Sequence, residues 1–132
     1  MKKPVIIDTD IGTDIDDTWA LVMALNSPEL DIKLITSATG DTILRAKIIA
    51  RLLEETGNAH IPIGIGIPRE HSYHYQEKWV EEYDLASYPG PIMNDGIGAI
   101  VDTVMESTEP LVIIGLAPLP NIAAALRCEP RI

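Results

Sequence analysis

Five aspartates lie within ten residues near the start of the chain, in the stretch DTDIGTDIDD: Asp8, Asp10, Asp14, Asp16 and Asp17. Carboxylates this close repel one another and raise one another's pKa unless a cation neutralises them. Oxygen ligands suit a hard divalent ion such as Ca²⁺ or Mg²⁺, and the stretch has no clustered Cys or His for Zn²⁺. A single aspartate here would be explained as a helix cap, but five predict a metal or polar-substrate site, because buried charge must be paired.

The acidic stretch is expected to join a buried strand to a helix with an acidic first turn, which suits the positive end of the helix dipole. Apolar residues recur at helical spacing there, at Trp19, Ala20, Met23 and Ala24. The remaining pattern alternates β-branched runs with longer helical ones. Strands are predicted over residues 5–7, 32–35, 61–65 and 111–114, and helices over residues 16–25, 41–55, 95–105 and 118–126.

This order predicts a single α/β domain over residues 1–132, with an open, mostly parallel twisted sheet and helices on both faces. Ligands bind such sheets at the carboxyl ends of the strands, which is where the acidic stretch begins. Gly12 permits a sharp turn that would fold the acidic side chains inward.

A segment of different composition, residues 66–95, follows the third predicted strand. It holds five of the six aromatic residues: Tyr73, Tyr75, Trp79, Tyr83 and Tyr88. Segments this long inside a compact domain are often functional lids. The alternative is a short amphipathic helix on the surface, with Trp79 and Tyr83 turned toward the body.

Charge and composition exclude several functional classes. Ten Lys plus Arg against twenty Asp plus Glu leave a net charge of −10, which disfavours nucleic-acid partners. Cys128 is the single cysteine, so no intrachain disulfide can form. The N-terminal apolar run is too short for a signal peptide, and the longest uncharged stretch, residues 110–126, is too short for a membrane span. We therefore expect a cytoplasmic protein without a membrane partner.

Two motif families fit the acidic stretch poorly. An EF-hand needs a helix before its loop, whereas a strand is predicted here. A haloacid-dehalogenase-like phosphatase would use Asp8 as nucleophile, but Ile11 separates Asp10 from Gly12 and breaks the Asp-x-Asp-Gly-Thr pattern. The phosphatase is kept as an alternative function.

The stretch VIIDTDIGTDIDDTWALVMAL resembles the N-terminal signature of the inosine-uridine preferring nucleoside hydrolase family, with Ile11 in place of the usual proline. The resemblance continues through LITSATGDTILRAKIIARLLEETG, IPIGIG and PLVIIGLAPLPNIAAALRCEP, and so covers nearly the whole chain. It implies a nucleoside hydrolase-like, Rossmann-like fold and calcium-assisted hydrolysis of the N-glycosidic bond of ribonucleosides.

The resemblance also implies roles for individual residues. Asp10 would be a metal ligand and the general base, Asp17 a second metal ligand, and the backbone carbonyl of Leu116 a third. Asp16 and Asp41 would bind the ribose, and Asp8 would orient the loop from behind. Asp14 receives no role.

Family members are considerably longer than this chain, so the resemblance is to their N-terminal portion and the sheet is expected to be incomplete. An incomplete sheet leaves an apolar edge, from which we expect a homo-oligomer. A non-catalytic fragment is a further alternative. The histidines are the remaining candidates: His60 is expected on the surface, whereas His71 or His74 could act as an acid on the leaving base.

Overall fold

The computed structural model describes residues 1–70 and 73–132, which form a parallel five-stranded sheet covered by helices. The strands are β1 (Lys3–Thr9), β2 (Leu30–Ser37), β3 (Ile63–Ile65), β4 (Ile92–Met93) and β5 (Val112–Gly115). The α-helices are α1 (Asp16–Leu25), α2 (Thr42–Glu55), α3 (Gly96–Glu106) and α4 (Pro120–Cys128), and two 3₁₀ turns are η1 (Glu77–Val80) and η2 (Leu85–Ser87). The predicted α/β fold is confirmed.

The strand order is β4-β3-β2-β1-β5, and every neighbouring pair is parallel. From β1 the chain adds strands on one side as far as β4, and then crosses to place β5 on the other side of β1. The direction of winding therefore reverses between β1 and β5. In open α/β sheets, ligands bind outside the carboxyl ends of the strands at such a switch point.

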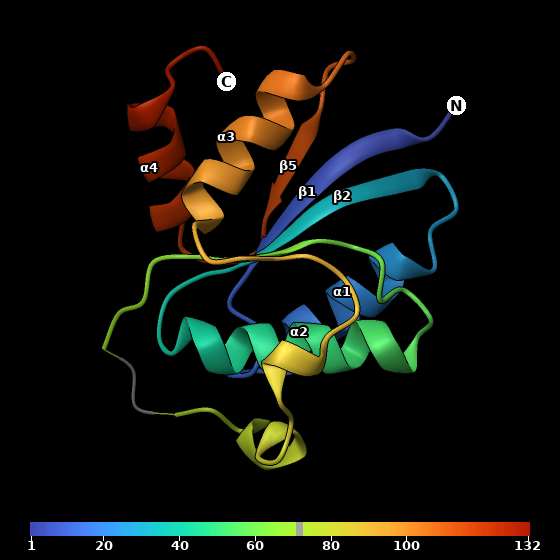
Figure 1. The fold of residues 1–132 in the computed structure, drawn as a ribbon, viewed down its shortest axis with the longest axis vertical. Helices are drawn as coiled ribbons and strands as arrows, with labels where there is room; N and C mark the ends of the chain where they lie inside the picture. The colour runs from blue at the N-terminus through green and yellow to red at the C-terminus, as the bar shows by residue number, and fades with distance from the viewer. Residues whose placement is uncertain (71–72) are drawn as a thin grey trace.

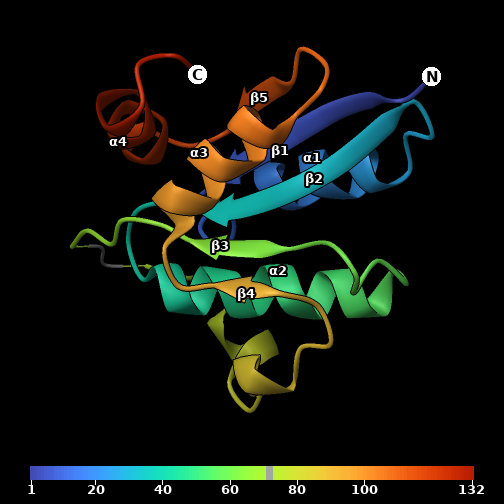
Figure 2. The same ribbon diagram turned by 45° about the horizontal axis from the view of Figure 1, so that its top comes forward.

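Alternation along the strands divides the core into two layers. Val5, Ile7 and Ile35 point to the side covered by α1 and α2, whereas Ile6 and Leu34 point to the side covered by α3 and α4. All five are at most 1% exposed. Figures 1 and 2 show the two helical layers on opposite sides of the sheet. Successive strand residues face opposite layers, so a strand buried on both faces is apolar throughout.

Helix α1 has the predicted bounds, but its spacing pattern does not mark its buried face. Trp19 and Met23 are 68% and 69% exposed, whereas Leu21 and Asp17 are buried. The helix buries Asp17 because that side chain reaches hydrogen-bond donors at the end of β1. A polar contact therefore sets the orientation of α1 as much as its apolar residues do.

Strand β4 lies inside the segment predicted to be a lid or a surface helix. It pairs in parallel with β3, through Ile63 with Ile92 and Gly64 with Met93, and Figure 2 shows it along the edge of the sheet. Two residues are too few to produce a recognisable alternation in the sequence.

Strand β3 and helix α4 each begin two residues later than predicted, the helix with Pro120 at its first position.

The aromatic segment packs on the outside of α2 through η1 and η2, as both ribbon views show. The Arg51 guanidinium lies 4.9 Å from the Trp79 ring centroid and also donates to the Trp79 carbonyl. Tyr83 donates its hydroxyl hydrogen to Glu54, and Tyr88 donates to the Ile61 carbonyl at 2.7 Å. These contacts agree with the surface-packing alternative, although the segment forms 3₁₀ turns rather than an α-helix.

None of the helices in the described parts of the chain combines the length and apolar character that crossing a membrane would require.

Candidate functional site

The residues that end β1 bring the acidic stretch to the switch point of the sheet. Asp8 follows Ile6 on the α3 and α4 side, whereas Thr9 follows Ile7 toward α1, and Asp10 comes directly after the strand. The Leu116 N–H donates to the Asp8 carbonyl at 2.8 Å, so the end of β5 lies directly beside them. Asp17 returns from the first turn of α1 to the same place.

Asp8 is fully buried. Its Oδ1 accepts hydrogen bonds from Thr36 Oγ1 at 2.5 Å and from Asn121 Nδ2 at 2.8 Å. Its Oδ2 is buried without a hydrogen-bond partner among the described residues. Burial raises the pKa of Asp8, the bonds from Thr36 and Asn121 oppose that shift, and the charge on Asp10 adds to it. A carboxylate this enclosed does not suit the nucleophile of the phosphatase alternative, which must meet its substrate.

Asp17 is 7% exposed, and its Oδ2 accepts from Thr9 Oγ1 at 2.5 Å and from the Asp10 N–H at 3.1 Å. Burial raises the pKa of Asp17 to about 6, the Thr9 hydroxyl opposes the shift, and the Asp10 carboxylate raises it further. The Asp10 carboxylate is therefore close enough to Asp17 to disfavour the charge on Asp17. A cation between them would remove that penalty.

The loop between β1 and α1 is held from α2 by Arg45, which is 1% exposed. The Arg45 guanidinium donates to the backbone carbonyls of Asp10 and Ile11 and to the Thr13 hydroxyl. Gly12 has a φ of 111°, and a Cβ there would lie 2.6 Å from Ile48 Cδ1. Both the backbone angle and the close packing require glycine at this position.

Asn121, at the start of α4, joins the ends of three strands. Its Nδ2 donates to Asp8 Oδ1 and, at 3.0 Å, to the Ser37 carbonyl, and its Oδ1 accepts from the Ile67 N–H at 2.9 Å. Gly66 lets this side chain approach, because a Cβ on Gly66 would lie 2.2 Å from Asn121 Nδ2. The buried amide thus satisfies backbone groups where the strands turn away from the sheet.

The other predicted site residues lie around this centre. Asp16 is exposed in the first turn of α1, and Asp14 is exposed in the loop before it. Asp41 is exposed and caps α2, because its Oδ1 accepts from the Leu44 N–H at 2.9 Å. Leu116 is half-buried beside Asp8. Asp8, Asp10, Asp17 and Leu116 are thus brought together, while the ribose contacts of Asp16 and Asp41 stay predictions.

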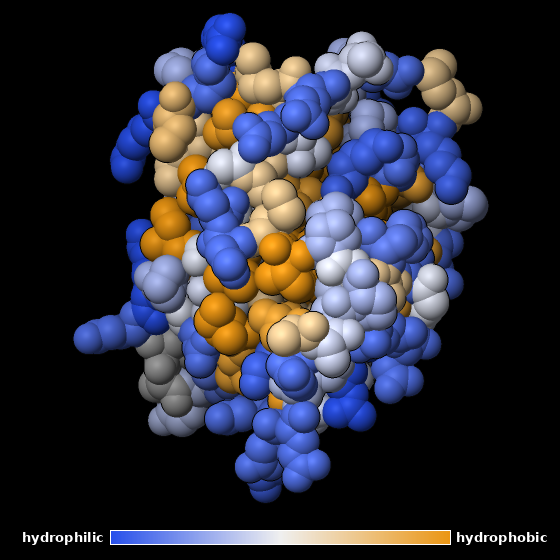
Figure 3. All heavy atoms as spheres, in the orientation of Figure 1, coloured by the Kyte–Doolittle hydropathy of each residue, from blue (hydrophilic) through white to orange (hydrophobic). Residues whose placement is uncertain are grey.

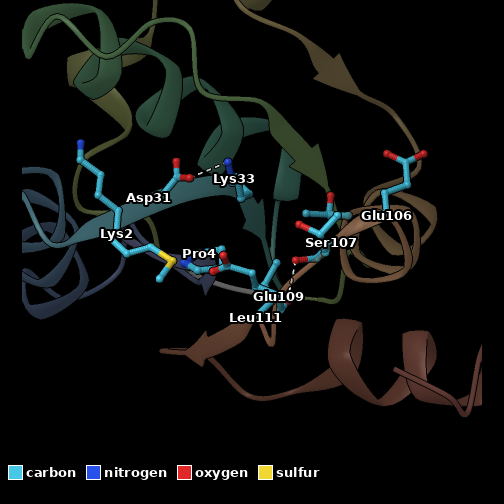
Figure 4. A pocket seen from close by; sticks show the side chains of 11 residues that line it. Lys2, Pro4, Asp31, Lys33, Glu106, Ser107, Glu109 and Leu111 are labelled. Carbon is cyan, nitrogen blue, oxygen red and sulfur yellow. Dashed lines mark hydrogen bonds and ion pairs between the residues drawn. The ribbon is translucent and has the colours of Figure 1, made fainter.

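The histidines and a separate hollow lie outside this centre. His60 is exposed, as predicted, and His74 is half-buried in the aromatic segment, whereas His71 lies outside the described residues. A hollow of about 550 Å³ opens at the amino ends of β1 and β2, where Lys2, Lys33 and Glu109 line it (Figure 4). Lys33 there is paired with Asp31 at 2.5 Å. This hollow is at the opposite end of the strands from Asp10.

The possible metal ligands around Asp10 and Asp17 fit only part of a cation site. They are all oxygen atoms, and Asp8 Oδ2 is a further buried oxygen, without a hydrogen-bond partner among the described residues. In residues 1–70 and 73–132, however, no three His, Cys, Asp or Glu side chains are arranged to hold a metal ion. The two carboxylates would need carbonyl oxygens, water or groups from outside this chain to complete the coordination of Ca²⁺.

Sequence reasoning missed Thr9, Thr36, Arg45 and Asn121, all of which are buried. A signal existed for Arg45, because it lies at helical spacing with the apolar residues Ile48, Ile49 and Leu52. An arginine on an otherwise apolar helical face must find acceptors inside the fold. Asn121 interrupts the apolar and proline-rich run 110–126 in a similar way, whereas threonine near a strand end carries no comparable signal.

Comparison with known proteins identifies the family of this chain. The sequence model of the family described as inosine-uridine preferring nucleoside hydrolase matches residues 5–132. The chain therefore belongs to the inosine-uridine preferring nucleoside hydrolase family.

Individual relatives share the match over nearly the whole chain. This chain is 33% identical to the non-specific ribonucleoside hydrolase RihC of Klebsiella pneumoniae, over 98% of its own length and 45% of that protein. The solved structure of a plant nucleoside hydrolase, PpNRh1, superposes with a TM-score of 0.81 at 32% identity, over 98% of this chain and 44% of that one. A nucleoside hydrolase of Bacillus anthracis, at 14% identity and a TM-score of 0.77, shares the fold. The chain spans less than half the length of these relatives.

Proposed function

We propose that this chain supplies the cation- and ribose-binding part of an enzyme that hydrolyses the N-glycosidic bond of ribonucleosides to free base and ribose. The observation that carries the proposal is the meeting of Asp8, Asp10 and Asp17 at the switch point between β1 and β5. Family membership and the printed names of the relatives support the substrate class.

In this proposal Asp10 is the general base. Its backbone is held on both sides, by Asp17 through the N–H and by Arg45 through the carbonyl, while its side chain is half-buried. The Asp10 carboxylate accepts a proton from water as the water oxygen bonds to the anomeric carbon. The bond from that carbon to the base nitrogen breaks, and the base departs with the electron pair.

Calcium is the proposed cofactor, held by Asp10, Asp17 and the Leu116 carbonyl. When bound, it would orient the ribose hydroxyls and lower the pKa of the attacking water. Asp16 and Asp41 would bind ribose hydroxyls. Asp8 would orient the loop that carries Asp10 from behind, because it is buried at the end of β1, two residues before Asp10. With so few protein donors, binding in roughly the millimolar range is expected.

The test combines substrate binding with hydrolysis. Inosine and uridine are added to ¹⁵N-labelled protein with Ca²⁺ or with a chelator, while amide shifts and released reducing sugar are followed. The proposal expects calcium-dependent shifts in residues 8–17, lost in Asp10→Asn and kept in Asp102→Asn, an exposed aspartate on α3. Absence of any nucleoside-dependent shift would contradict it. Shifts without sugar release would favour the non-catalytic alternative.

We also propose that the chain self-associates. β4 and β5 stand at the two ends of the strand order, and Met93 and Val112 on them are 40% and 41% exposed. Figure 3 shows apolar side chains reaching the surface in a band between α3 and α2. Sedimentation velocity across a concentration series tests this, and a monomer at every concentration would contradict it.

A further inference from the structure

Arg45 is a buried cation in the second turn of α2, and it binds two loops at once. From one side its Nη1 donates to the carbonyls of Asp10 and Ile11, the latter at 2.8 Å, and to Thr13 Oγ1 at 3.0 Å. From the other side its Nε donates to the Thr39 carbonyl at 2.8 Å. One loop carries Asp10 and the other leads into Asp41. The guanidinium is thus a crosslink between the two loops of the proposed site.

Both loops contain backbone conformations that need such support. Gly12 has a φ of 111°, and Thr39 and Gly40 both have a φ of 60°. Thr39 is the costly member, because a β-branched side chain rarely adopts a positive φ. Its carbonyl is the acceptor of the Arg45 Nε bond. The carbonyls of Asp10 and Ile11 likewise point away from the sheet ladder, toward the guanidinium.

The charge of Arg45 has an effect opposite to that of its geometry. Burial lowers the pKa of Arg45, while the charges on Asp10, Asp17 and Asp41 act to raise it. All three carboxylates therefore interact electrostatically with this cation. A positive charge this close repels an incoming Ca²⁺. If Arg45 only neutralised the acidic cluster, removing it would strengthen calcium binding. If it positions the loops, removing it would weaken calcium binding.

We propose that Arg45 is a positioning residue that holds the Asp10–Thr13 backbone and Thr39 in the arrangement used for cation and ribose binding, before either ligand arrives. The part concerning calcium rests on the proposed function above. The part concerning the loops rests on the hydrogen bonds alone. A guanidinium suits this role because its donors point in several fixed directions at once, whereas a lysine ammonium is a single point of charge.

The test compares Arg45→Met, which removes the charge and the donors, with Arg45→Lys, which keeps the charge. Arg127→Met removes an exposed arginine from the last turn of α4 and serves as the matched control. Amide hydrogen exchange is measured by NMR with a chelator present, at Asp10, Ile11, Ala38 and Thr39. These amides all donate hydrogen bonds within or beside the two loops. Strand amides in β1 and β2 report global stability.

The expected result is at least tenfold faster exchange at the four loop amides in Arg45→Met, beyond any change in the strand amides. A smaller acceleration is expected in Arg45→Lys, and none in Arg127→Met. Loop exchange that follows the strand amides in both Arg45 variants would overturn the proposal. If Arg45→Met does not fold, Arg45→Lys decides: unchanged loop protection in that variant overturns the proposal.

Calcium titration followed by amide shifts is the second readout. Arg45→Met is expected to bind Ca²⁺ at least threefold more weakly despite losing a repulsive charge, with Arg45→Lys in between and Arg127→Met unchanged or slightly tighter. Equal or tighter binding by Arg45→Met would overturn the positioning role. If the unmodified protein shows no calcium-dependent shift, the proposed cation site fails, and the exchange data alone then decide the role of Arg45.

Discussion

The Thr9 hydroxyl donates to Asp17 Oδ2 at 2.5 Å and thereby ties the last residue of β1 to the first turn of α1. The Asp10 N–H donates to the same oxygen at 3.1 Å. Two protein donors therefore orient the Asp17 carboxylate. The hydrogen bonds of the fold therefore organise the acidic loop.

Asp17→Asn is expected to stabilise the chelator-treated protein at neutral pH. In the fold, burial raises the Asp17 pKa from 3.8 to about 6, so folding favours the protonated form. The contribution of the Asp17 carboxyl group to stability is therefore fully present below about pH 4 and is lost as the pH rises through about 6. Asparagine keeps the acceptor oxygen without the charge. The free energy of unfolding should rise by roughly 1–3 kcal/mol at pH 7.5 and change little at pH 4.

Urea unfolding at both pH values measures this effect, with Asp102→Asn as the control for loss of an exposed charge. A loss of stability at pH 7.5 would show that the ionised Asp17 serves the fold.

Thr9→Val is expected to lower the free energy of unfolding by about 1–3 kcal/mol, because two bonds are lost from a buried position. Asp17 loses the hydrogen bond from the Thr9 hydroxyl and keeps that from the Asp10 N–H, and the Ile11 N–H loses the Thr9 Oγ1 acceptor at 3.1 Å. The Asp17 pKa should rise further in this variant, since in the unmodified protein the Thr9 hydroxyl opposes the effect of burial. Carboxyl ¹³C titration by NMR measures the pKa. Thr108→Val, at an exposed position, should change neither quantity.

Gly66→Ala and Asn121→Ala are expected to be strongly coupled. Each should cost at least about 2 kcal/mol alone, through a clash with Asn121 and Ser37 in the first case and lost buried hydrogen bonds in the second. In the double variant the clash with the Asn121 side chain is gone while the clash with the Ser37 carbonyl remains, so the combined cost should fall below the sum but stay above that of Asn121→Ala alone. Chemical unfolding of all four proteins measures the coupling. Additive costs would show that Gly66 does not make room for Asn121.

Arg51→Met is expected to loosen the aromatic segment while leaving the core intact. Arg51 holds the Trp79 ring and its carbonyl against α2, and Trp79 itself is 37% exposed. Acrylamide quenching of Trp79 in a Trp19→Phe background should increase, while the unfolding free energy changes by less than about 1 kcal/mol. Arg127→Met should leave the quenching unchanged. Equal quenching in both variants would assign the segment's attachment to other contacts, such as Tyr83 with Glu54.

The sequence alone was sufficient to determine the α/β fold class and to indicate the end of β1 as the place of a candidate site. Continuous apolar runs such as Val5–Ile7 and amphipathic runs such as the one that forms α2 are local patterns, since strands and helices bury side chains at different periods. The concentration of carboxylates after β1 is also visible in the sequence. Local structure alone does not explain why five carboxylates that repel one another lie so close together, so they indicate a candidate site. Both predictions agree with the parallel sheet and with the meeting of Asp8, Asp10 and Asp17.

Only the tertiary structure decided which polar residues support that site. Arg45, Asn121 and Thr36 reach the acidic loop or Asp8 from positions 28 to 113 residues away in sequence. Strand β4 forms by hydrogen bonding to the edge of β3. Trp19 faces solvent because the same helix turns Asp17 toward Thr9 in the interior. The physical reason is common to all of these: a buried polar group must find its partner somewhere in the fold, and the sequence shows that need without showing which distant residue meets it.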